Sequence, residues 1–209
     1  MDDVIIRAAV PADVPAIVEL QNALLGTTAI EWTDEPHHVD ERLTWLAAQD
    51  RAGNPVLVAE RLGTVIGFGA YGDFRDTAKW PGYRFTIEHT VHVDDGSWGS
   101  GVGRRLVEAL CDHAATAGKH VIIAAIDSDN VASIRFHERL GFTEVGRLPE
   151  VGARFGRWLT LVMLQRTLTR GDPPVAPEAE RERCPTRERA GHRSESVSTQ
   201  VAVNMISGV

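Results

Sequence analysis

Cysteine is scarce in this chain of 209 residues, which contains only Cys111 and Cys184. Cys111 falls inside a helix-like pattern and Cys184 in a polar tail, so the pair has neither the number nor the spacing of a disulfide framework or a thiolate metal site. We therefore expect two free thiols and no bound metal.

Long hydrophobic runs are also missing, because a polar or charged residue interrupts every apolar stretch well before membrane-spanning length. The first residues, MDDVIIRAAV, carry two acids where a secretory signal would carry positive charge. From these features we expect a cytoplasmic protein that makes no contact with a membrane.

Positive charge is in deficit, since 22 Lys and Arg stand against 29 Asp and Glu and give a formal net charge of −7. A protein that binds nucleic-acid phosphates needs a basic surface, so no nucleic-acid partner is expected. The hydrophobic fraction of 43%, in contrast, is enough to form a core. The composition therefore predicts a globular protein.

Aromatic residues disappear after residue 169, where the composition changes. Residues 170–209 begin RGDPPVAPEAERERCPTRERAGHRSES and combine clustered prolines with mixed Arg and Glu. Such a segment buries too little apolar surface to offset the entropy cost of ordering it. We expect one folded domain over residues 1–169 and a disordered tail over residues 170–209.

Within residues 1–169, strand-like and helix-like segments alternate with short turns, a pattern typical of a layered α/β fold. A first strand is expected over residues 4–8, a helix after Asp13 as its N-cap, and a second helix around residues 39–46. Residues 55–74 read as a hairpin that turns at residues 61–63. The stretch HVIIAAIDS at 120–128 reads as a buried strand, and Asn130 or Ser133 as the start of a short helix.

A glycine-rich turn at Gly99, Gly101 and Gly103 joins a strand of β-forming residues to an amphipathic helix. Glycines at such a junction let several backbone N–H groups point at one bound ligand. The positive end of the helix dipole favours an anionic ligand such as a pyrophosphate. By itself a glycine-rich turn is more often only a turn. Neither the Walker pattern nor a Rossmann fingerprint fits it, so the surrounding motifs must decide.

Downstream of this turn the chain carries Asn130, Ser133, His137 and the pair Gly141-Phe142. Together with GSGVG at 99–103 and the order of elements, this run resembles the GNAT superfamily of acetyl-CoA-dependent N-acetyltransferases over about residues 3–168. The resemblance implies an α/β fold with a mixed, twisted central sheet and helices on both faces. It also implies that acetyl-CoA is the co-substrate.

Four further motifs narrow the resemblance: TTAIEWTDEP at 27–36, YGDFR at 71–75, TIEHTVHV at 86–93 and VGARFGRW at 151–158. They are similar to the branch of phosphinothricin and methionine sulfoximine N-acetyltransferases. That branch implies a homodimer that acetylates the α-amino group of a small amino acid. Two departures stand out: Trp98 replaces the Gln or Arg usual in the superfamily, and DTAKWPG lengthens the connection between Arg75 and Tyr83.

The resemblance also implies which residues bind acetyl-CoA. Main-chain groups of one strand would pair with the pantetheine arm, backbone N–H groups of the glycine turn would hold the pyrophosphate, and the start of the short helix would contact the far part of the arm. The expected set is Val91, His92, Val93, Gly99, Ser100, Gly101, Val102, Gly103, Arg104, Asn130 and Ser133.

Glu88 and His137 are the expected catalytic residues. A protonated amine has no lone pair with which to attack a thioester, so a base must first take its proton. Glu88 lies in an apolar strand run, where burial raises a carboxyl pKa, and its place in TIEHTVHV favours this role over that of a strand-edge or salt-bridged carboxylate. His137 stands where many GNAT enzymes carry a Tyr and would protonate the leaving thiolate; the alternative is a surface histidine with a local hydrogen bond.

Two arginines favour an anionic group on the substrate. Arg75 and Arg84 flank the expected catalytic strand, and a guanidinium fork suits the carboxylate of a zwitterionic amino acid; ordinary surface arginines are the alternative. His89 and His92 fall on opposite faces of that strand, so they do not form a metal pair. The expected substrate-binding set is Arg75, Asp76, Thr77, Arg84, Glu88, His89 and Thr90.

Other interpretations stay open at this point. Within the same fold, the acetylated amine could belong to a protein N-terminus or to a polyamine, although a polyamine would favour an acidic pocket without paired arginines. From another class, the chain could be a non-catalytic sensor that binds acyl-CoA. The presence of both Glu88 and His137 argues against the sensor.

Overall fold

A computed structural model describes residues 4–25, 32–169 and 171. All the helices and strands described lie in the unit Met1–Arg170, and the second unit, Gly171–Val209, is represented by Gly171 alone. The expected disordered tail and the first residues of the motif at 27–36 therefore lie outside the described residues. In the described ranges, no helix has the length and apolar character needed to cross a membrane.

The described chain forms seven strands and four α-helices, with short 3-10 turns between them. The strands are β1 Val4–Ala8, β2 Val56–Arg61, β3 Thr64–Asp73, β4 Thr86–Val93, β5 Val121–Asp127, β6 Thr143–Arg154 and β7 Arg157–Thr167. The helices are α1 Val14–Asn22, α2 Val39–Arg51, α3 Val102–Thr116 and α4 Val131–Arg139.

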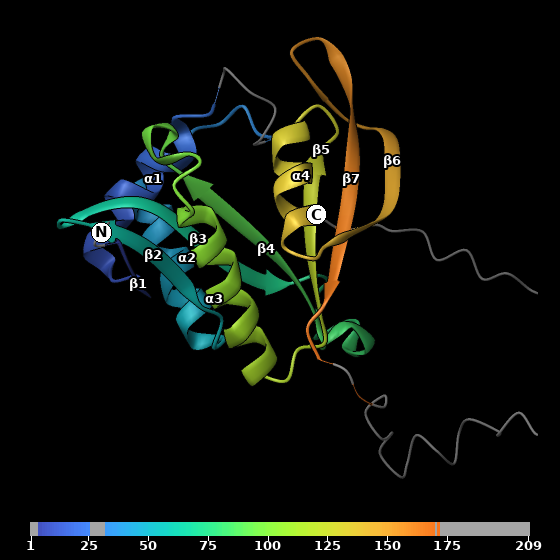
Figure 1. The fold of residues 1–209 in the computed structure, drawn as a ribbon, viewed down its shortest axis with the longest axis horizontal. Coiled ribbons are helices and arrows are strands. Elements are labelled where there is room, and N and C mark those ends of the chain that lie inside the picture. The colour runs from blue at the N-terminus through green and yellow to red at the C-terminus, as the bar shows by residue number, and fades with distance from the viewer. Residues whose placement is uncertain (1–3, 26–31, 170, 172–209) are drawn as a thin grey trace, which may run out of the picture. The chain divides into compact units, whose positions relative to one another are not determined.

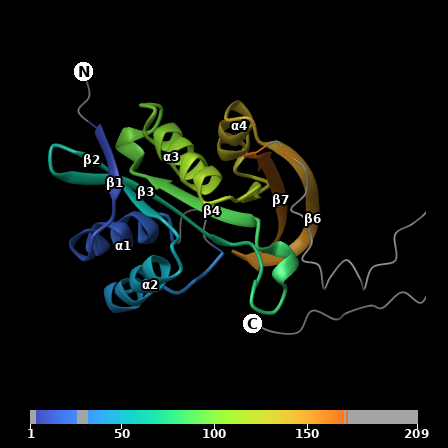
Figure 2. The same ribbon diagram turned by 90° about the horizontal axis from the view of Figure 1, so that it is seen from below.

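The strands form one mixed sheet in the order β1-β2-β3-β4-β5-β7-β6. Only β4 and β5 run parallel, and the other neighbours are antiparallel. Figure 2 shows the sheet twisted between two helical layers, with α1 and α2 on one face and α3 and α4 on the other. The expected mixed sheet with helices on both faces is confirmed.

The core divides along these two faces. On one face, Leu110 of α3 and Ile134 of α4 pack with Ile87 of β4 and Ile122 of β5. On the other face, Ile17 of α1 packs on residues of β2 and β3. Helix α3 lies close to β3 because Gly69 has no side chain, and a Cβ there would come within 3.1 Å of Leu110 Cδ1.

The expected local signals are mostly found, with one correction. The hairpin between β2 and β3 turns at Leu62-Gly63, both with positive φ, and Asn130 caps α4 by accepting the Ser133 N–H. Asp13 precedes α1 as expected, but its carboxylate makes no cap bond to that helix. Instead it binds the Arg7 guanidinium at 2.7 and 2.8 Å and accepts the Val10 N–H, because an ion pair to β1 is available.

Candidate active site

A gap opens between β4 and β5, the two parallel strands in the middle of the sheet. They pair at only three positions, Thr86 with Val121, Ile87 with Ile122 and Glu88 with Ile123, and then diverge. Figure 1 shows the two strands close at one end and splayed at the other. The strands border a cavity of about 180 Å³, which is also lined by residues from the start of α4.

Beyond Glu88, the backbone of β4 faces this gap with no neighbouring strand among the described residues. β4 stays paired with β3 over its whole length, and Asp94 N–H donates to the Ile66 carbonyl oxygen at 3.0 Å. In an antiparallel ladder this register directs the main-chain groups of His92 toward β3, and those of Val91 and Val93 away from it. Val91 and Val93 therefore direct their main-chain groups into the gap, where the Val93 carbonyl oxygen accepts the Trp98 indole N–H at 2.8 Å. His92 also lines the cavity.

The glycine turn lies between the end of β4 and the start of α3. Gly99 and Gly101 have φ of +75° and +86°, and a Cβ on either would have no neighbouring atom within 4 Å. Among the described residues, no side chain caps the first turn of α3, so its backbone N–H groups are available at the positive end of the helix dipole. The turn and the gap together fit a ligand with a pyrophosphate and an extended, amide-bearing arm.

Glu88 is the half-buried carboxylate of the cavity. Burial raises the pKa of its carboxyl group, and the positive charge of Arg75 lowers it in part. On β4 its side chain shares a face with Thr90 and His92, whose Nε2 lies 3.2 Å from the Thr90 hydroxyl oxygen. A carboxyl group with a raised pKa beside a cavity is suited to accept a proton near neutral pH.

His137 and His89 form a pair of buried imidazoles on the opposite face of β4. Their ring centres are 5.2 Å apart, and His137 Nδ1 lies 2.8 Å from the Ser133 carbonyl oxygen. A carbonyl only accepts, so Nδ1 carries the proton and Nε2 of the neutral ring is an acceptor. Burial lowers the pKa of both rings, that of His89 to about 3. His137 can therefore donate from Nε2 only after it has taken up a proton.

Asp127 is a cavity residue that the sequence patterns did not single out. It ends β5, is buried, and accepts the Asp129 N–H at 2.8 Å through Oδ1. Its Oδ2 has no hydrogen-bond partner among the described residues. The sequence did contain a signal for Asp127, which is an acidic residue near the end of the buried run HVIIAAIDS. A buried carboxylate oxygen needs a hydrogen-bond donor, so such a residue is a candidate for binding a ligand.

Apart from Val93, which ends β4, the expected site residues fall into three groups. Glu88, His89, Thr90, Val91, His92, Asn130, Ser133 and His137 all line the cavity. The residues of the glycine turn lie at the N-terminal end of α3, where Arg104 pairs with Glu108 at 2.8 Å. Among the described residues, no group of three or more His, Cys, Asp or Glu is placed to hold a metal ion.

The third group comes from the segment after β3 and lies outside the cavity wall. Asp76 accepts two backbone N–H groups of its own turn, and Thr77 donates to Asp73 at 2.6 Å. Arg84 donates to the Pro81 carbonyl oxygen at 3.0 Å and lies over the Phe85 ring. Of this group, Arg75 is the residue that acts on Glu88 electrostatically.

Comparison with known proteins agrees with this geometry. Residues 17–142 match the model of the acetyltransferase (GNAT) family. The chain is 44% identical, over 83% of its length and 98% of the relative's, to an L-methionine sulfoximine/L-methionine sulfone acetyltransferase of Salmonella typhimurium. It is 35% identical, over 77% of its length and 80% of the relative's, to a phosphinothricin N-acetyltransferase of Alcaligenes faecalis.

Solved structures show the same likeness in three dimensions. The structure of yncA from Salmonella typhimurium, with its cofactor acetyl-CoA, matches this chain with a TM-score of 0.79. The two are 43% identical, and the match covers 84% of this chain and 99% of the other.

Proposed function

Because the chain belongs to the acetyltransferase (GNAT) family, we propose that it transfers the acetyl group of acetyl-CoA to the α-amino group of a small amino acid. L-Methionine sulfoximine, L-methionine sulfone and phosphinothricin are the proposed substrates, after the relatives that carry those names. The observation that carries the proposal is the gap between β4 and β5, with the main chain of Val91 and Val93 on one side and Glu88 at its narrow end.

Each part of the cavity has a proposed role in binding acetyl-CoA. The Val91 and Val93 main chain would pair with the pantetheine arm in the way that a neighbouring strand would. The N–H groups from Gly99 to Arg104 would hold the pyrophosphate. Asn130 and Ser133 line the same cavity, and the unpartnered Oδ2 of Asp127 is an acceptor for an N–H or O–H of the arm.

Glu88 is the proposed general base. Acetyl-CoA supplies a thioester whose carbonyl carbon forms a bond to the amine nitrogen as the bond to sulfur breaks. Before this, Glu88 takes the extra proton of the ammonium group, which its raised pKa favours. His137 is the proposed acid: its Nε2 can take up the second proton, which the nitrogen loses as the amide forms, and give it to the thiolate sulfur, so that CoA leaves as a thiol.

Arg75 is the proposed partner of the substrate's carboxylate. The positive charge of Arg75 lowers the pKa of Glu88, so the two side chains are near each other. A substrate carboxylate bound to Arg75 would therefore lie near the base, which an α-amino acid requires because its carboxylate and amine share one carbon atom. Arg84 makes a hydrogen bond to its own turn and would have to turn away from Pro81 to complete a guanidinium fork. The expected role of Arg84 therefore depends on a rearrangement when the substrate binds.

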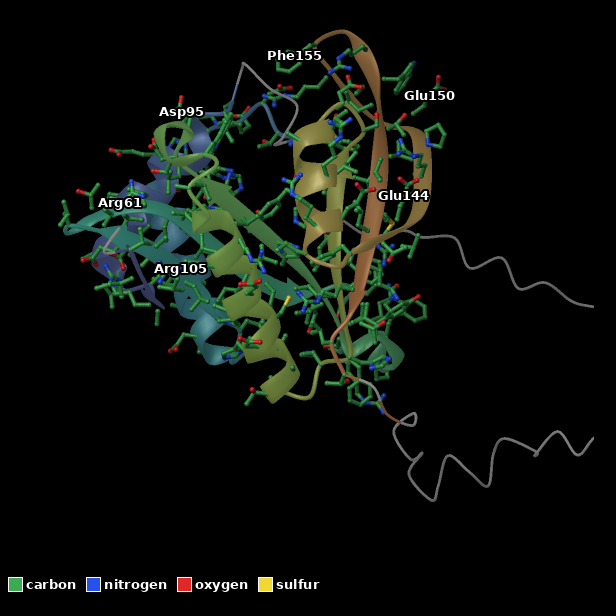
Figure 3. The ribbon with its side chains drawn as sticks, in the orientation of Figure 1. Arg61, Asp95, Arg105, Glu144, Glu150 and Phe155 are labelled. Carbon is green, nitrogen blue, oxygen red and sulfur yellow. The ribbon has the colours of Figure 1, made fainter. Side chains whose placement is uncertain are left out.

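A homodimer is also part of this proposal. β6 is an edge of the sheet, and the hairpin that it forms with β7 exposes Val145, Val151, Phe155 and Trp158. Figure 3 shows Phe155 at the tip of this hairpin and Glu144 and Glu150 along its edge. An unpaired strand edge with apolar side chains supports pairing with a second copy. Sedimentation at micromolar concentration tests it: a monomer would contradict the dimer.

A cytoplasmic location completes the proposal. It follows the expectation from the sequence.

A panel of amines tests the proposed function, with thiol released from acetyl-CoA as the readout. L-Methionine sulfoximine, L-methionine sulfone and phosphinothricin should give higher kcat/KM than spermidine or a peptide with a free N-terminus. A higher value for spermidine or the peptide would contradict the proposed substrate class. Binding of CoA without thiol release for any amine would support the sensor instead.

A further inference from the structure

Trp98 makes a contact to which the proposed function gives no role. It lies in the turn between β4 and α3, at the position where the sequence departs from the Gln or Arg usual in the superfamily. Its indole Nε1–H donates to the Val93 carbonyl oxygen at 2.8 Å, while 62% of the residue stays exposed. Trp98 therefore bonds to the end of β4 and does not fill the core.

The turn that carries Trp98 has few other attachments to the sheet. Its first residue, Asp94, donates its N–H to Ile66 of β3, and Val102, the first residue of α3, is buried in a cluster with Ala59 and Ile66 of the sheet. Between these two points, the other hydrogen bonds among the described residues join the turn to itself or to the start of α3. The Trp98 indole is thus the side chain that connects the middle of this glycine-containing turn to β4.

The bond also changes what β4 offers to a ligand. The pairing register directs the Val93 carbonyl into the gap, and the indole N–H already satisfies it. The Val91 main-chain groups and the Val93 N–H are left for an arm inserted in the gap. The same contact therefore joins two surfaces that one extended ligand would touch, the turn and the strand edge.

We propose that Trp98 is a positioning residue for the pyrophosphate of acetyl-CoA, a role that rests on the proposed function. The indole N–H holds the turn against β4, so that the N–H groups from Gly99 to Arg104 converge before the ligand arrives. Preorganisation of this kind reduces the ordering that binding must impose on a flexible, glycine-containing segment. Trp98 acts on affinity for the nucleotide end of acetyl-CoA and not on the acetyl transfer step.

The variant Trp98→Phe tests this role, because it keeps an aromatic ring and removes the N–H donor. We expect its KM for acetyl-CoA and its Kd for CoA to rise three- to tenfold, roughly what the loss of one neutral hydrogen bond corresponds to. kcat and the KM for the amine should stay within about twofold of wild type. S-Acetylpantetheine, which lacks the pyrophosphate, should be used equally well by both proteins.

Three results would overturn the role. An unchanged Kd for CoA in Trp98→Phe, with a loss only in Trp98→Ala, would assign the effect to ring packing. Equal losses with acetyl-CoA and S-acetylpantetheine would indicate a general distortion of the gap. A fall in kcat at saturating acetyl-CoA would place Trp98 in the transfer step. A wild-type protein that binds CoA but acetylates none of the amino acids would contradict the proposed function alone, since the CoA affinities still report on Trp98.

Discussion

His89 makes the stability of this fold sensitive to acid, and the variant His89→Phe measures by how much. The ring is buried against His137 and Phe142, and neither of its nitrogens has a partner among the described residues. Burial lowers its pKa to about 3, and the neighbouring His137 adds to the effect. An unfolded histidine titrates near 6.5, so the folded protein resists a proton that the unfolded chain accepts.

The sign and size follow from this difference. The free energy of unfolding is unaffected above pH 6.5 and falls as the pH drops toward 3, because only the unfolded state binds the proton in that window. At 1.36 kcal/mol per pKa unit, the loss from this one group is about 2 kcal/mol at pH 5 and reaches roughly 4 to 5 kcal/mol near pH 3. Phenylalanine in the same place has no proton to gain.

Urea unfolding of both proteins between pH 7.5 and 4.5 checks the prediction. At each pH, the free energy of unfolding of wild type is subtracted from that of His89→Phe. The contributions of the carboxylates and other titrating groups that the two proteins share cancel in this difference. That difference should grow in favour of the variant by about 2 kcal/mol from pH 7 to pH 5. The variant His38→Phe is the control, because His38 is exposed and lies away from the cavity. It measures how much replacing an imidazole with a phenyl ring changes the free energy of unfolding by itself. A difference that stays flat with pH would refute the assignment of His89 as a buried, neutral ring.

Three further predictions concern the ligands. Gly101→Ala should raise the KM for acetyl-CoA several-fold. Gly118→Ala is the control and should leave this KM unchanged: Gly118 has a similar positive φ at the far end of α3, so an alanine there carries the same backbone strain of about 1 kcal/mol. Arg75→Ala should raise the KM for methionine sulfoximine at least tenfold and, by removing a nearby positive charge, move the acid limb of the kcat/KM profile to higher pH. Asp127→Asn should raise the KM for acetyl-CoA about tenfold without changing that of the amine.

Much of the fold could be predicted from the sequence because its signals are local. Alternating apolar residues, the Leu62-Gly63 turn and the Asn130 cap depend on a few neighbouring residues, and the structure has each of them where the pattern predicts it. No strand was predicted from the sequence over the residues of β6 and β7. Most of β6 is exposed at the sheet edge, so it carries no clear alternation.

The structure brings many of the expected site residues together, and their roles in binding and catalysis stay predictions. Eight expected residues line one cavity because the motifs that carry the resemblance lie on β4 and at the start of α4, which border it. No local pattern could show that the Ser133 carbonyl fixes the proton of His137 on Nδ1, or that Arg84 bonds to its own turn. Asp127 was missed because its burial depends on how β5 and α4 meet.

The role of Glu88 as the base in this gap is tested most directly by kinetics of Glu88→Gln over a range of pH. The substitution keeps the shape of the side chain and removes its ability to take a proton. At pH 7 we predict a kcat for methionine sulfoximine lower by about 100-fold, with the Kd for CoA within about twofold of wild type. The defect should shrink as the pH approaches the pKa of the substrate's own amine, because a neutral amine no longer needs a base. Wild-type turnover in a folded Glu88→Gln protein, or a defect of constant size up to high pH, would contradict this account.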